Sequence, residues 1–424
     1  MFSKFDLGNE SESGKLMMTI MHRPGDELRR LNENNLDQLL FDEIPDINST
    51  KKSHDIFTEY LRAHGTKVLY VKPLLLETLI HSTAACHMLI GGIIENSFYN
   101  TNHDHEDLIM ALYQWLLTRT PEQLVEDVIT GVACTTTELG DSGYAATILA
   151  MHDRNNEFII PPLPNLLFTR DAFSVIEKNV FIWHMAKLAR QNEPLIFRVI
   201  FQYHPQLSTS GLKIVEWETR KNDQEYLTIE GGDLAYYGQG ILLIGCGERT
   251  NRSSIEALAR TGLFRQVIAI VIPPQRDYMH LDTVLSTVGK HAFTLHGLLA
   301  NQMDIFTIET RDDNNNMLIK ARWISHGHDI RQALRKLLND SELIFYDAAD
   351  EATSIVEQRE CRHNVLVLDD CHVLTYKGGH SEKGIVAQMI WNNACRVGLI
   401  PTDGLLEGCG GMHCMTNALR RRHL

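Results

Sequence analysis

The feature that most limits the fold of this 424-residue chain is a repeated alternation of short apolar segments with amphipathic ones. The short segments are rich in Val, Ile, Leu and aromatic residues, which predicts β-strands. These predicted strands are residues 16–21, 66–72, 179–185, 225–230, 240–247, 266–274, 303–309, 343–348 and 364–370. The predicted helices between them are residues 53–65, 251–262, 329–340 and 380–395. Such alternation predicts an α/β fold. No exact internal repeat is visible, although the recurring unit could be a diverged repeat.

One region interrupts the alternation. From about residue 75 to 150 the pattern is almost entirely helical, in the segments 74–96, 104–117 and 120–132. The proline-rich segment PPLPN at 161–165 then marks the return to strands. We therefore expect an α/β domain in two parts, residues 1–74 and 151–424, with a helical bundle inserted at 75–150.

The composition narrows the class of protein. The chain is 44% hydrophobic and has a formal net charge of −14, which argues against non-specific binding to nucleic acid or to an anionic membrane surface. The N-terminus lacks the apolar run of a secretory signal, and no stretch reaches 18 consecutive apolar residues. The eight cysteines are scattered at irregular spacing, which favours reduced thiols in a cytoplasmic protein.

Three short stretches place acids and a histidine in unusual settings. PNLLFTRD ends in Asp171, which could equally form a salt bridge with Arg170. IEGGD places Glu230 and Asp233 around two glycines, which let a backbone approach a ligand closely but also suit a hairpin turn with solvated acids.

In the third stretch, HLDT, an extended backbone would point His280 and Asp282 to one side and Leu281 to the other. The alternative is a surface histidine followed by an aspartate turn.

The stretch GCGGMHCMTN, near the C-terminus, allows three interpretations. Cys409, His413 and Cys414 could bind a metal, but His413 and Cys414 are adjacent and no paired CxxC motif accompanies them. The cysteines could pack as small apolar side chains. Cys414 could also be a nucleophile, provided that a cation or a base such as the remote His280 activates it. His103–Asp107 likewise suggests a metal site, although acids also suit a solvated helix start.

Taken together, these stretches resemble the guanidine-modifying enzymes, and arginine deiminase most closely. The resemblance runs through MHRPGDELRRL, LLFDEIPD, PPLPNLLFTRD, IEGGDL, IGCGERTNR, HLDTVLS and MHCMTNAL, in the order of that family. It implies a five-bladed, pseudosymmetric α/β propeller with an inserted helical bundle. It also implies hydrolysis of L-arginine to L-citrulline and ammonia through a covalent S-alkylthiouronium intermediate, without metal or cofactor.

The resemblance also implies roles for individual residues. Cys414 matches the nucleophile, His280 the general acid and base, and Glu230 the acid beside the histidine. Asp171 and Asp282 match the carboxylates that hold the guanidinium group.

The expected substrate-binding residues form a second set. Asn165, Arg190 and Arg249 match positions that hold the backbone end of the substrate, and Asp233 is expected to position its neighbours. Phe168 and His413 complete the predicted set. Some relatives carry an arginine at the position of Cys409, which leaves carboxylate recognition here to Arg190 and Arg249.

Several alternatives remain at this stage. An agmatine deiminase uses similar residues, but its substrate has no carboxylate for Arg190 and Arg249 to bind. An amidinotransferase would pass the amidino group to an amine rather than to water. A protein that keeps the fold without catalysis and a structural zinc protein are further possibilities. We expect L-arginine as the small-molecule partner and a homo-oligomeric assembly.

Overall fold

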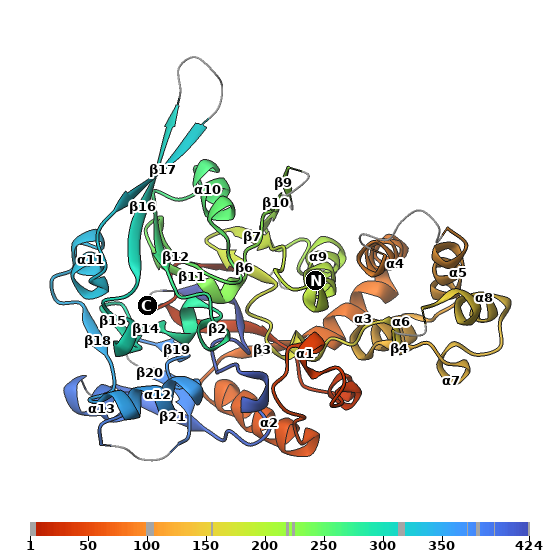
Figure 1. Ribbon diagram of the computed structural model, residues 1–424, viewed down its shortest axis with the longest axis horizontal. Helices are drawn as coiled ribbons and strands as arrows, with labels where there is room; N and C mark the ends of the chain where they lie inside the picture. Colours follow the sequence, from red (N-terminus) through yellow and green to blue (C-terminus); the bar gives the residue numbers. More distant parts are fainter. Residues whose placement is uncertain are drawn as a thin grey trace.

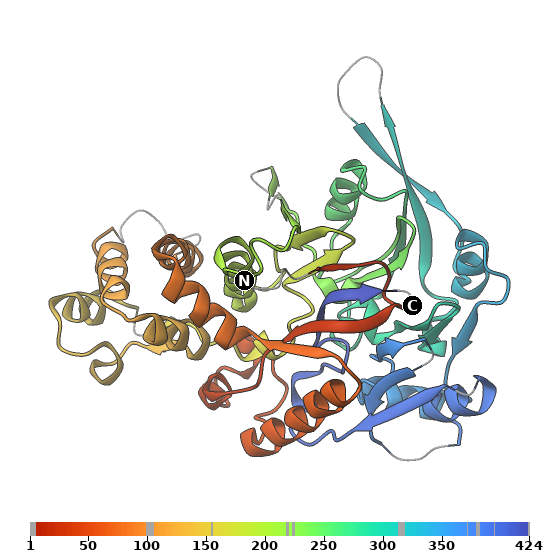
Figure 2. The same ribbon diagram turned by 180° about the vertical axis from the view of Figure 1, so that it is seen from behind.

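The computed structural model describes residues 6–98, 106–153, 156–217, 220–222, 225–312, 319–370, 372–378, 382–393 and 395–422. These residues form a mixed α/β structure, as the alternation predicts. Figures 1 and 2 show an α/β part that contains both ends of the chain, with a helical part extending from one side.

The described strands form five sheets of three or more strands, and all five contain the same unit. Two antiparallel strands come first, and a third strand then pairs in parallel with the second after a helical crossover. Parallel neighbouring strands need such a crossover because the chain must return to the end of the sheet at which the previous strand began. The recurring unit is therefore a diverged repeat, the possibility that the alternation along the sequence left open.

Units 1 to 5 are numbered in chain order of their first strands. Unit 1 contains β6 (Phe173–Ile176), β7 (Asn179–Ile182), α9 (Asn192–Tyr203) and β8 (Lys213–Glu216). Unit 2 contains β11 (Leu234–Gly238), β12 (Ile241–Cys246), α10 (Arg252–Arg260) and β13 (Gln266–Val271). Unit 3 contains β14 (Leu285–Gly289), β15 (Ala292–Leu295), α11 (Ile330–Leu337) and β18 (Ile344–Tyr346).

Unit 4 contains β19 (Leu366–Asp369), β20 (His372–Tyr376), α13 (Ile385–Asn393) and β21 (Arg396–Ile400), and follows α12 (Glu351–Arg359). Unit 5 joins the two ends of the chain in β22 (Asn417–Arg422), β2 (Lys15–Met21), α2 (Ile47–Ala63) and β3 (Lys67–Tyr70), with β1 (Gly8–Asn9) at its edge. The hairpin β16 (Asp304–Asp312) and β17 (Ile319–Ser325) extends the sheet of unit 2 and projects from the molecule (Figure 1).

The strands of unit 2 are apolar throughout because both of their faces are buried. Leu242 and Ile244 of β12 pack in one core with Ile255 of α10. Leu243, between them, points to the other face and packs in a second core with Leu334 of α11. Alternate residues of a strand face opposite sides, so a continuous apolar run is what a strand between two cores requires.

The helical part contains α3 (Val71–His81), α4 (Thr83–Ser97), α5 (Glu106–Leu117), α6 (Pro121–Thr130), α7 (Thr136–Leu139) and α8 (Gly143–Met151), and the short strands β4 (Val132–Ala133) and β5 (Phe158–Ile160). It shares a continuous core with α9 of unit 1. Residues 103–105, part of the stretch considered as a metal site, lie outside the described residues.

Several predicted boundaries differ from the structure. The helix predicted at 74–96, for example, is the two helices α3 and α4. The helix predicted from residue 53 begins at Ile47, because the side chain of Asp46 caps it by accepting a hydrogen bond from the Ser49 amide at 2.8 Å. The strand predicted at 225–230 is paired only at β10 (Glu225–Tyr226), against β9 (Arg220–Asn222). The residues that follow turn inward instead and form part of the candidate site.

Within the described residues, no single helix has the length and apolar character needed to cross a membrane. The helices α3 and α4 pass that test only together, and they are bent by 119° at their junction.

Candidate active site

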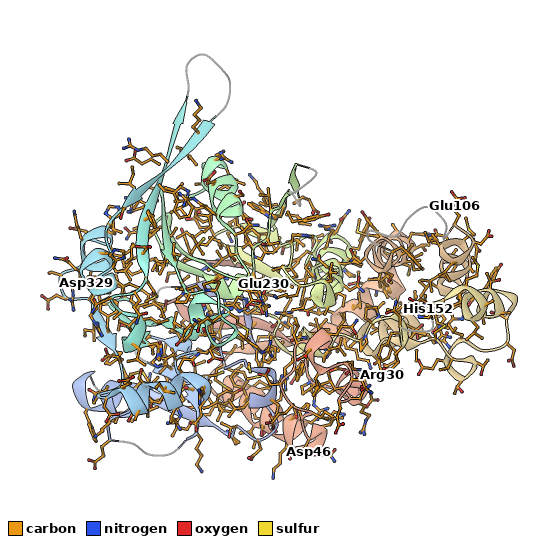
Figure 3. All side chains as sticks on the ribbon, in the orientation of Figure 1. Arg30, Asp46, Glu106, His152, Glu230 and Asp329 are labelled. Atoms are coloured by element: carbon orange, nitrogen blue, oxygen red, sulfur yellow. The ribbon has the colours of Figure 1, made fainter. Side chains whose placement is uncertain are left out.

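The residues directly before the first strand of each unit, here called the leading segments, meet at one place. They contribute Asp171 in unit 1, Glu230 in unit 2, His280 in unit 3, Asn364 in unit 4 and Cys414 in unit 5. Polar contacts link Asp171, Glu230 and His280 across units 1 to 3. A hydrogen bond links Asn364 to Cys414 across units 4 and 5, and Cys414 also contacts Asp282 of the leading segment of unit 3. Glu230 lies near the middle of the α/β part, far from peripheral residues such as Asp46 and Asp329 (Figure 3).

The thiol of Cys414 is buried, with 4% of the residue exposed. Its Sγ accepts a hydrogen bond from Asn364 Nδ2 at 3.1 Å and lies 3.5 Å from Asp282 Oδ2. The Cys414 amide donates to Asn364 Oδ1 at 3.1 Å, so one asparagine holds both the backbone and the sulfur. Burial, together with the charges of Asp282 and Asp171, raises the pKa of the thiol well above its usual range. Ionisation of the sulfur therefore requires a cation close by.

His280 is held between two carboxylates. Its Nε2 donates to Glu230 Oε2 at 2.7 Å, and its Nδ1 lies 3.8 Å from Asp171 Oδ1. Burial alone would lower the pKa of His280, but Asp171 and Glu230 raise it to about 9. Burial also opposes the ionisation of Glu230, yet Arg249 and His280 hold its pKa well below its usual range. The site thus keeps a protonated imidazole beside an ionised carboxylate at neutral pH.

Asp171 and Asp282 are both buried and have different partners. Asp171 accepts from Arg190 Nη1 at 2.7 Å and from the Gly232 amide at 3.0 Å. Asp282 Oδ2 pairs with His413 Nδ1 at 2.7 Å, while its Oδ1 is buried without a hydrogen-bond partner among the described residues. Burial raises the pKa of Asp282, but His413 outweighs it and the net shift is downward. The unpaired oxygen is a free acceptor for a substrate N–H group.

The glycines of IEGGD serve close approach rather than a solvated hairpin. A Cβ atom on Gly232 would lie 2.8 Å from His280 Cγ and 2.9 Å from Asp171 Oδ1. Glu230 and Asp233 are both fully buried. Asp233 Oδ1 accepts from the Leu281 amide at 2.9 Å, and burial raises the pKa of Asp233 to about 7. Asp233 thus anchors the backbone next to His280.

The backbone at HLDT is only partly extended. His280 is extended, but Leu281–Thr283 forms a 3-10 turn. Leu281 packs in the core of unit 3, as expected for the residue between two site side chains. The side chains of His280 and Asp282 are both buried, which rules out the alternative of a surface histidine.

The predicted substrate arginines are both bound to acids of the site. Arg190 donates twice to Glu193, at 2.9 and 2.8 Å, and once to Asp171. Burial raises the pKa of Glu193 to about 7. Arg249 Nη1 donates to Glu230 Oε2 at 3.0 Å, and its buried Nε makes no hydrogen bond to the described residues. Both guanidinium groups help to keep Glu230 charged.

The remaining predicted residues surround the thiol. Asn165 donates to the Leu39 carbonyl at 2.6 Å, and the ring of Phe168 lies against Gly410, where a Cβ atom would meet it at 2.2 Å. His413 bridges Asp282 and Glu12, with its Nε2 2.9 Å from Glu12 Oε1. Since both of its ring nitrogens face carboxylates, His413 fixes the orientation of Asp282.

These side chains line a narrow cavity of about 20 Å³, which is room for about one water molecule. Its lining residues include Asn165, Phe168, Asp171, Arg190, Arg249, Arg276, His280, Cys409 and Cys414. A guanidinium group is larger than one water molecule, so side chains at the cavity mouth must move when a substrate enters.

Asp171, Glu230 and His280 bring one potential ligand atom each within 4.8 Å of one another, a geometry that could hold a metal ion. The guanidinium groups of Arg190 and Arg249 already provide positive charge at these carboxylates, and would repel a further cation. The three C-terminal residues considered as metal ligands bond to separate partners: Cys409 to Asp42, His413 to Asp282 and Glu12, and Cys414 to Asn364.

Sequence reasoning missed Asn364 and Glu12. Asn364 occupies the leading segment of unit 4, just as Cys414 does in unit 5, so the repeat would have identified it. Glu12 binds His413 and Arg170, and its pKa is held well below its usual range because the charges of Arg170 and Arg421 and the hydrogen bond from His413 outweigh its burial. No local motif marks Glu12.

Comparisons with known proteins identify the fold and the family. The solved structure of an amidinotransferase from Microseira wollei is similar to this one, with a TM-score of 0.53 at 13% sequence identity. The match covers 99% of this chain and 98% of the amidinotransferase chain. The fold is therefore that of an amidinotransferase-like α/β protein. The family model for arginine deiminase matches residues 37–421.

Full-length relatives lead to the same family. Arginine deiminases from Clostridium perfringens, Limosilactobacillus fermentum and Staphylococcus aureus are 30%, 31% and 31% identical, and each match covers 98% of both chains. The chain belongs to the arginine deiminase family of enzymes.

Proposed function

We propose that this enzyme hydrolyses L-arginine to L-citrulline and ammonia. The observation that carries the proposal is the position of Cys414: its buried Sγ lies 3.5 Å from Asp282, beside a cluster of Asp171, Glu230 and protonated His280. A buried pocket with several carboxylates and a thiol can bind a planar guanidinium group and present its central carbon to an anionic sulfur. The family supports the same reaction.

The two aspartates hold the guanidinium group. Asp171 and the free oxygen of Asp282 accept its N–H groups in charge-assisted hydrogen bonds. These bonds fix its plane and leave one face open to Cys414. Ideal positioning of this kind can lower the activation barrier by about 7–11 kcal/mol.

In the first half-reaction the arriving cation lowers the pKa of the Cys414 thiol, the thiol proton passes to solvent, and the thiolate attacks the central carbon. His280 donates a proton to one terminal nitrogen of the tetrahedral adduct. That C–N bond breaks, ammonia leaves, and an S-alkylthiouronium remains on Cys414. General acid catalysis of this kind contributes about 10²–10⁴-fold.

In the second half-reaction water attacks the thiouronium carbon and His280, now neutral, accepts its proton. The C–S bond breaks as the sulfur takes up the remaining hydroxyl proton, citrulline leaves, and the thiol and the protonated histidine are restored. Glu230 keeps the imidazole oriented and favours its protonated form throughout.

We assign substrate binding to Asn165, Phe168, Arg190, Arg249 and His413. Arg249 supports this role because its Nε makes no hydrogen bond within the described residues, whereas Arg190 would have to give up a bond to Glu193 or Asp171 in order to bind a carboxylate. Asp233 acts as a positioning residue through the Leu281 amide.

We further propose that the five units surround one axis as a five-bladed propeller, with the site where their leading segments meet. The repeated topology and the contacts between neighbouring units support this arrangement. In this scheme the helices near residues 75–150 are an insertion between residues 1–74 and 151–424 of the propeller domain.

We also propose a cytoplasmic, homo-oligomeric enzyme that requires no nucleic acid or membrane. Seven cysteines in the described residues are free thiols, which suits a reducing compartment. Exposed apolar side chains on the helical part, such as Ile80 and Met110, suit contact with another subunit. Light scattering with size-exclusion chromatography measures the assembly, and a strict monomer would contradict that part of the proposal.

The test of function is a citrulline and ammonia assay on the purified protein. L-Arginine should give one citrulline per ammonia, and agmatine and peptidyl arginine should react far more slowly. Glycine added to the assay should not divert the amidino group, because an amidinotransferase would form guanidinoacetate instead. Absence of citrulline from arginine would reject the proposal.

A further inference from the structure

The cavity has three arginines, and they differ in what surrounds them. The side chains of Arg190 and Arg249 are 4% and 3% exposed and are hydrogen-bonded to the acids of the site. The side chain of Arg276 is 38% exposed and lines the mouth of the same cavity. Arg276 is therefore the cavity arginine that a charged group arriving from solvent meets first.

Arg276 lies in the 3-10 turn η5 (Arg276–Tyr278), four residues before His280. Its Nε donates to Asp42 Oδ1 at 2.8 Å, and its Nη2 donates to the Leu40 carbonyl at 3.2 Å. Its Nη1 makes no hydrogen bond to the described residues. The guanidinium group thus keeps donors for a further acceptor, and it already has an anionic partner that is itself 47% exposed.

Asp42 connects Arg276 to the cysteine stretch. Its other oxygen, Oδ2, accepts from Cys409 Sγ at 2.5 Å. Cys409 is held in a left-handed conformation, with φ of 56°, at the end of the 3-10 turn Leu406–Gly408. A carboxylate and a guanidinium group therefore lie side by side at the mouth of the cavity, and the thiol of Cys409 fixes the carboxylate.

We propose that Arg276 and Asp42 together recognise the zwitterionic end of the substrate, with Arg276 binding its α-carboxylate and Asp42 its α-ammonium group. This inference rests on the proposed function. Five bonds separate the guanidinium carbon of arginine from its Cα, a span of about 6 Å. A substrate with its guanidinium group at Cys414 therefore carries its charged end outward, towards the mouth.

Charge complementarity makes the exchange favourable. An exposed ion pair such as Arg276–Asp42 contributes little to stability, so separating the two side chains costs little. Each then meets an opposite charge on the substrate, and one ion pair becomes two. A guanidinium group can bind a carboxylate through two parallel hydrogen bonds. The same movement widens a cavity that otherwise has room for about one water molecule.

The ligand class follows from this pairing. A free α-amino acid with a guanidinium side chain satisfies both charges. Agmatine lacks the carboxylate, L-argininamide keeps only the ammonium group, and Nα-acetyl-L-arginine keeps only the carboxylate. Each analogue therefore tests recognition by one of the two residues, Arg276 for the carboxylate or Asp42 for the ammonium group.

The experiment compares L-arginine with L-argininamide in Arg276→Ala, Arg276→Lys and a control variant, Arg265→Ala. Arg265 is exposed and lies at another cavity. In Arg276→Ala the preference for arginine over argininamide in kcat/KM should fall by about 10–100-fold, the range for a lost hydrogen bond to a charged group. Arg276→Lys should recover part of that preference, and Arg265→Ala should leave it within about twofold of wild type.

The ammonium half is tested with Asp42→Asn and Nα-acetyl-L-arginine. Asp42→Asn should weaken the preference for arginine over its acetylated form. Calorimetric binding of the same ligands to Cys414→Ala proteins gives these ratios without turnover, so the inference is decided even if arginine is not hydrolysed. An unchanged ratio in Arg276→Ala, with arginine still converted by wild type, would overturn the inference alone. Failure of wild type to form citrulline would overturn the proposed function.

Discussion

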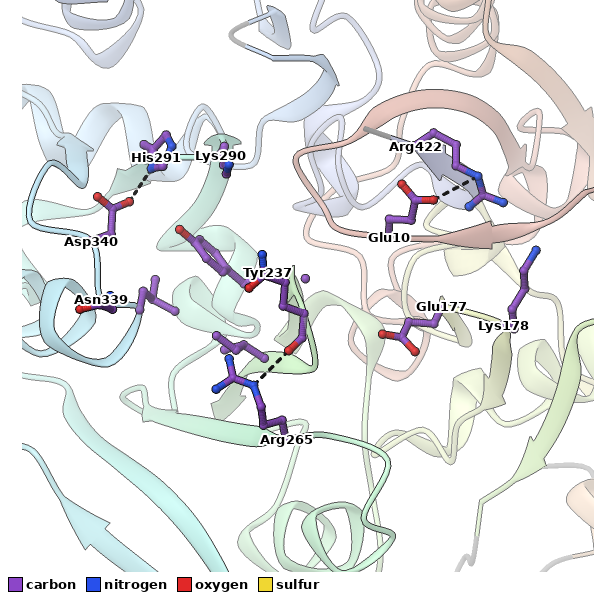
Figure 4. A pocket seen from close by; sticks show the side chains of 14 residues that line it. Glu10, Glu177, Lys178, Tyr237, Arg265, Lys290, His291, Asn339, Asp340 and Arg422 are labelled. Atoms are coloured by element: carbon purple, nitrogen blue, oxygen red, sulfur yellow. Dashed lines mark hydrogen bonds and ion pairs between the residues drawn. The ribbon is translucent and has the colours of Figure 1, made fainter. Parts of the chain in front are cut away.

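The two ends of the same hairpins create opposite environments. At the leading ends of β6, β11 and β14, Asp171, Glu230 and His280 are buried and bonded to one another. At the far ends of these strands, their turns line another cavity (Figure 4). The strands have four or five residues, so about 13–17 Å separates the two environments.

The cavity at the turns is far larger than the candidate site, at about 890 Å³. It is also rich in charge, but the charges are paired at the surface. Glu10 lies 3.4 Å from Arg422, and His291 lies 2.6 Å from Asp340. Figure 4 shows these pairs along the rim of the cavity. One partner of each pair is well exposed, Glu10 at 46% and His291 at 56%, so water screens these pairs and they contribute little energy.

Exclusion of water, rather than cavity volume, therefore distinguishes the leading ends of these strands from their turns. At the leading ends, buried neighbours raise the pKa of His280 to about 9 and hold that of Glu230 well below its usual range. Such opposed shifts define an acid and its charged partner. The predictions below test whether chemistry is confined to that end.

The largest effect is expected from the sulfur. Cys414→Ala should lower kcat by about 10³-fold or more, since no other nucleophile replaces the thiolate. Arginine should still bind, as calorimetry would show. The matched control is Cys86→Ala in the helical part, which should keep activity within about twofold. Retention of more than about a tenth of the activity in Cys414→Ala would refute its role as nucleophile.

The next largest effects are expected from Asp171 and Asp282, the two carboxylates that hold the guanidinium group and are here called the guanidinium clamp. Asp171→Ala and Asp282→Ala should each lower kcat by about 10²-fold or more, because the cation loses both its fixed plane and its charge partner. Steady-state kinetics separates this from weaker binding: a rise in KM with kcat unchanged would mean that the carboxylate is no part of the clamp. Asp340→Ala, at the turn cavity, is the matched control.

The pH dependence of kcat tests the opposed pKa shifts of His280 and Glu230. With the pKa of His280 at about 9, the first half-reaction should lose activity as pH rises through about 9. Glu230→Gln removes one of the two carboxylates beside the imidazole, so this alkaline limb should move down by about 1–3 pH units. The profile of kcat against pH measures it. A limb that stays in place would show that another group sets it.

The same shift has a consequence for stability. The pKa of His280 in the folded protein lies above its unfolded value of about 6.5. The resulting stabilisation is therefore fully present below pH 6.5 and is lost as pH rises through about 9. Thermal unfolding of wild type should show this loss between about pH 6.5 and 9, and Glu230→Gln should show less of it.

Much of the fold follows from local sequence. The apolar runs at β12 and β13 predict buried strands, and the arginine deiminase motifs predict most of the side chains that meet at the site. The five-fold repeat does not follow, because unit 5 joins β22 to β2 from opposite ends of the chain. The hairpin β16–β17 further separates the strands of unit 3. Spacing along the sequence therefore hides a repeat that is evident in space.

Partners of charged residues are equally hard to predict. Arg190 binds Glu193, three residues away, and this pairing was not anticipated. Cys409 binds Asp42 across 367 positions, which no local pattern indicates. Long-range pairings depend on how the units pack, so sequence identifies the reactive groups more readily than the groups that orient them.

Asn364 tests an orienting group of this kind. Asn364→Ala removes the hydrogen bonds to both the Sγ and the amide of Cys414, so kcat should fall by about 10-fold, while KM changes little. Asn364→Asp keeps an acceptor for the amide but places a negative charge beside the sulfur, which should slow alkylation of Cys414 further. Alkylation rates by a haloacetamidine measure this directly. Equal rates in wild type and both variants would mean that the asparagine has only a structural role.

The smallest effect is expected at the turn cavity, and it is the sharpest test of the comparison. Lys290 and His291 follow β14 just as Asp282 precedes it, so the same strand carries both environments. Lys290→Ala changes an exposed charge that lies a strand length from Cys414, where water and salt screen its field. Activity towards arginine should stay within about twofold at both low and physiological salt. A larger loss that salt abolishes would show that the charges at the turns act on the site, and that burial alone does not separate the two ends.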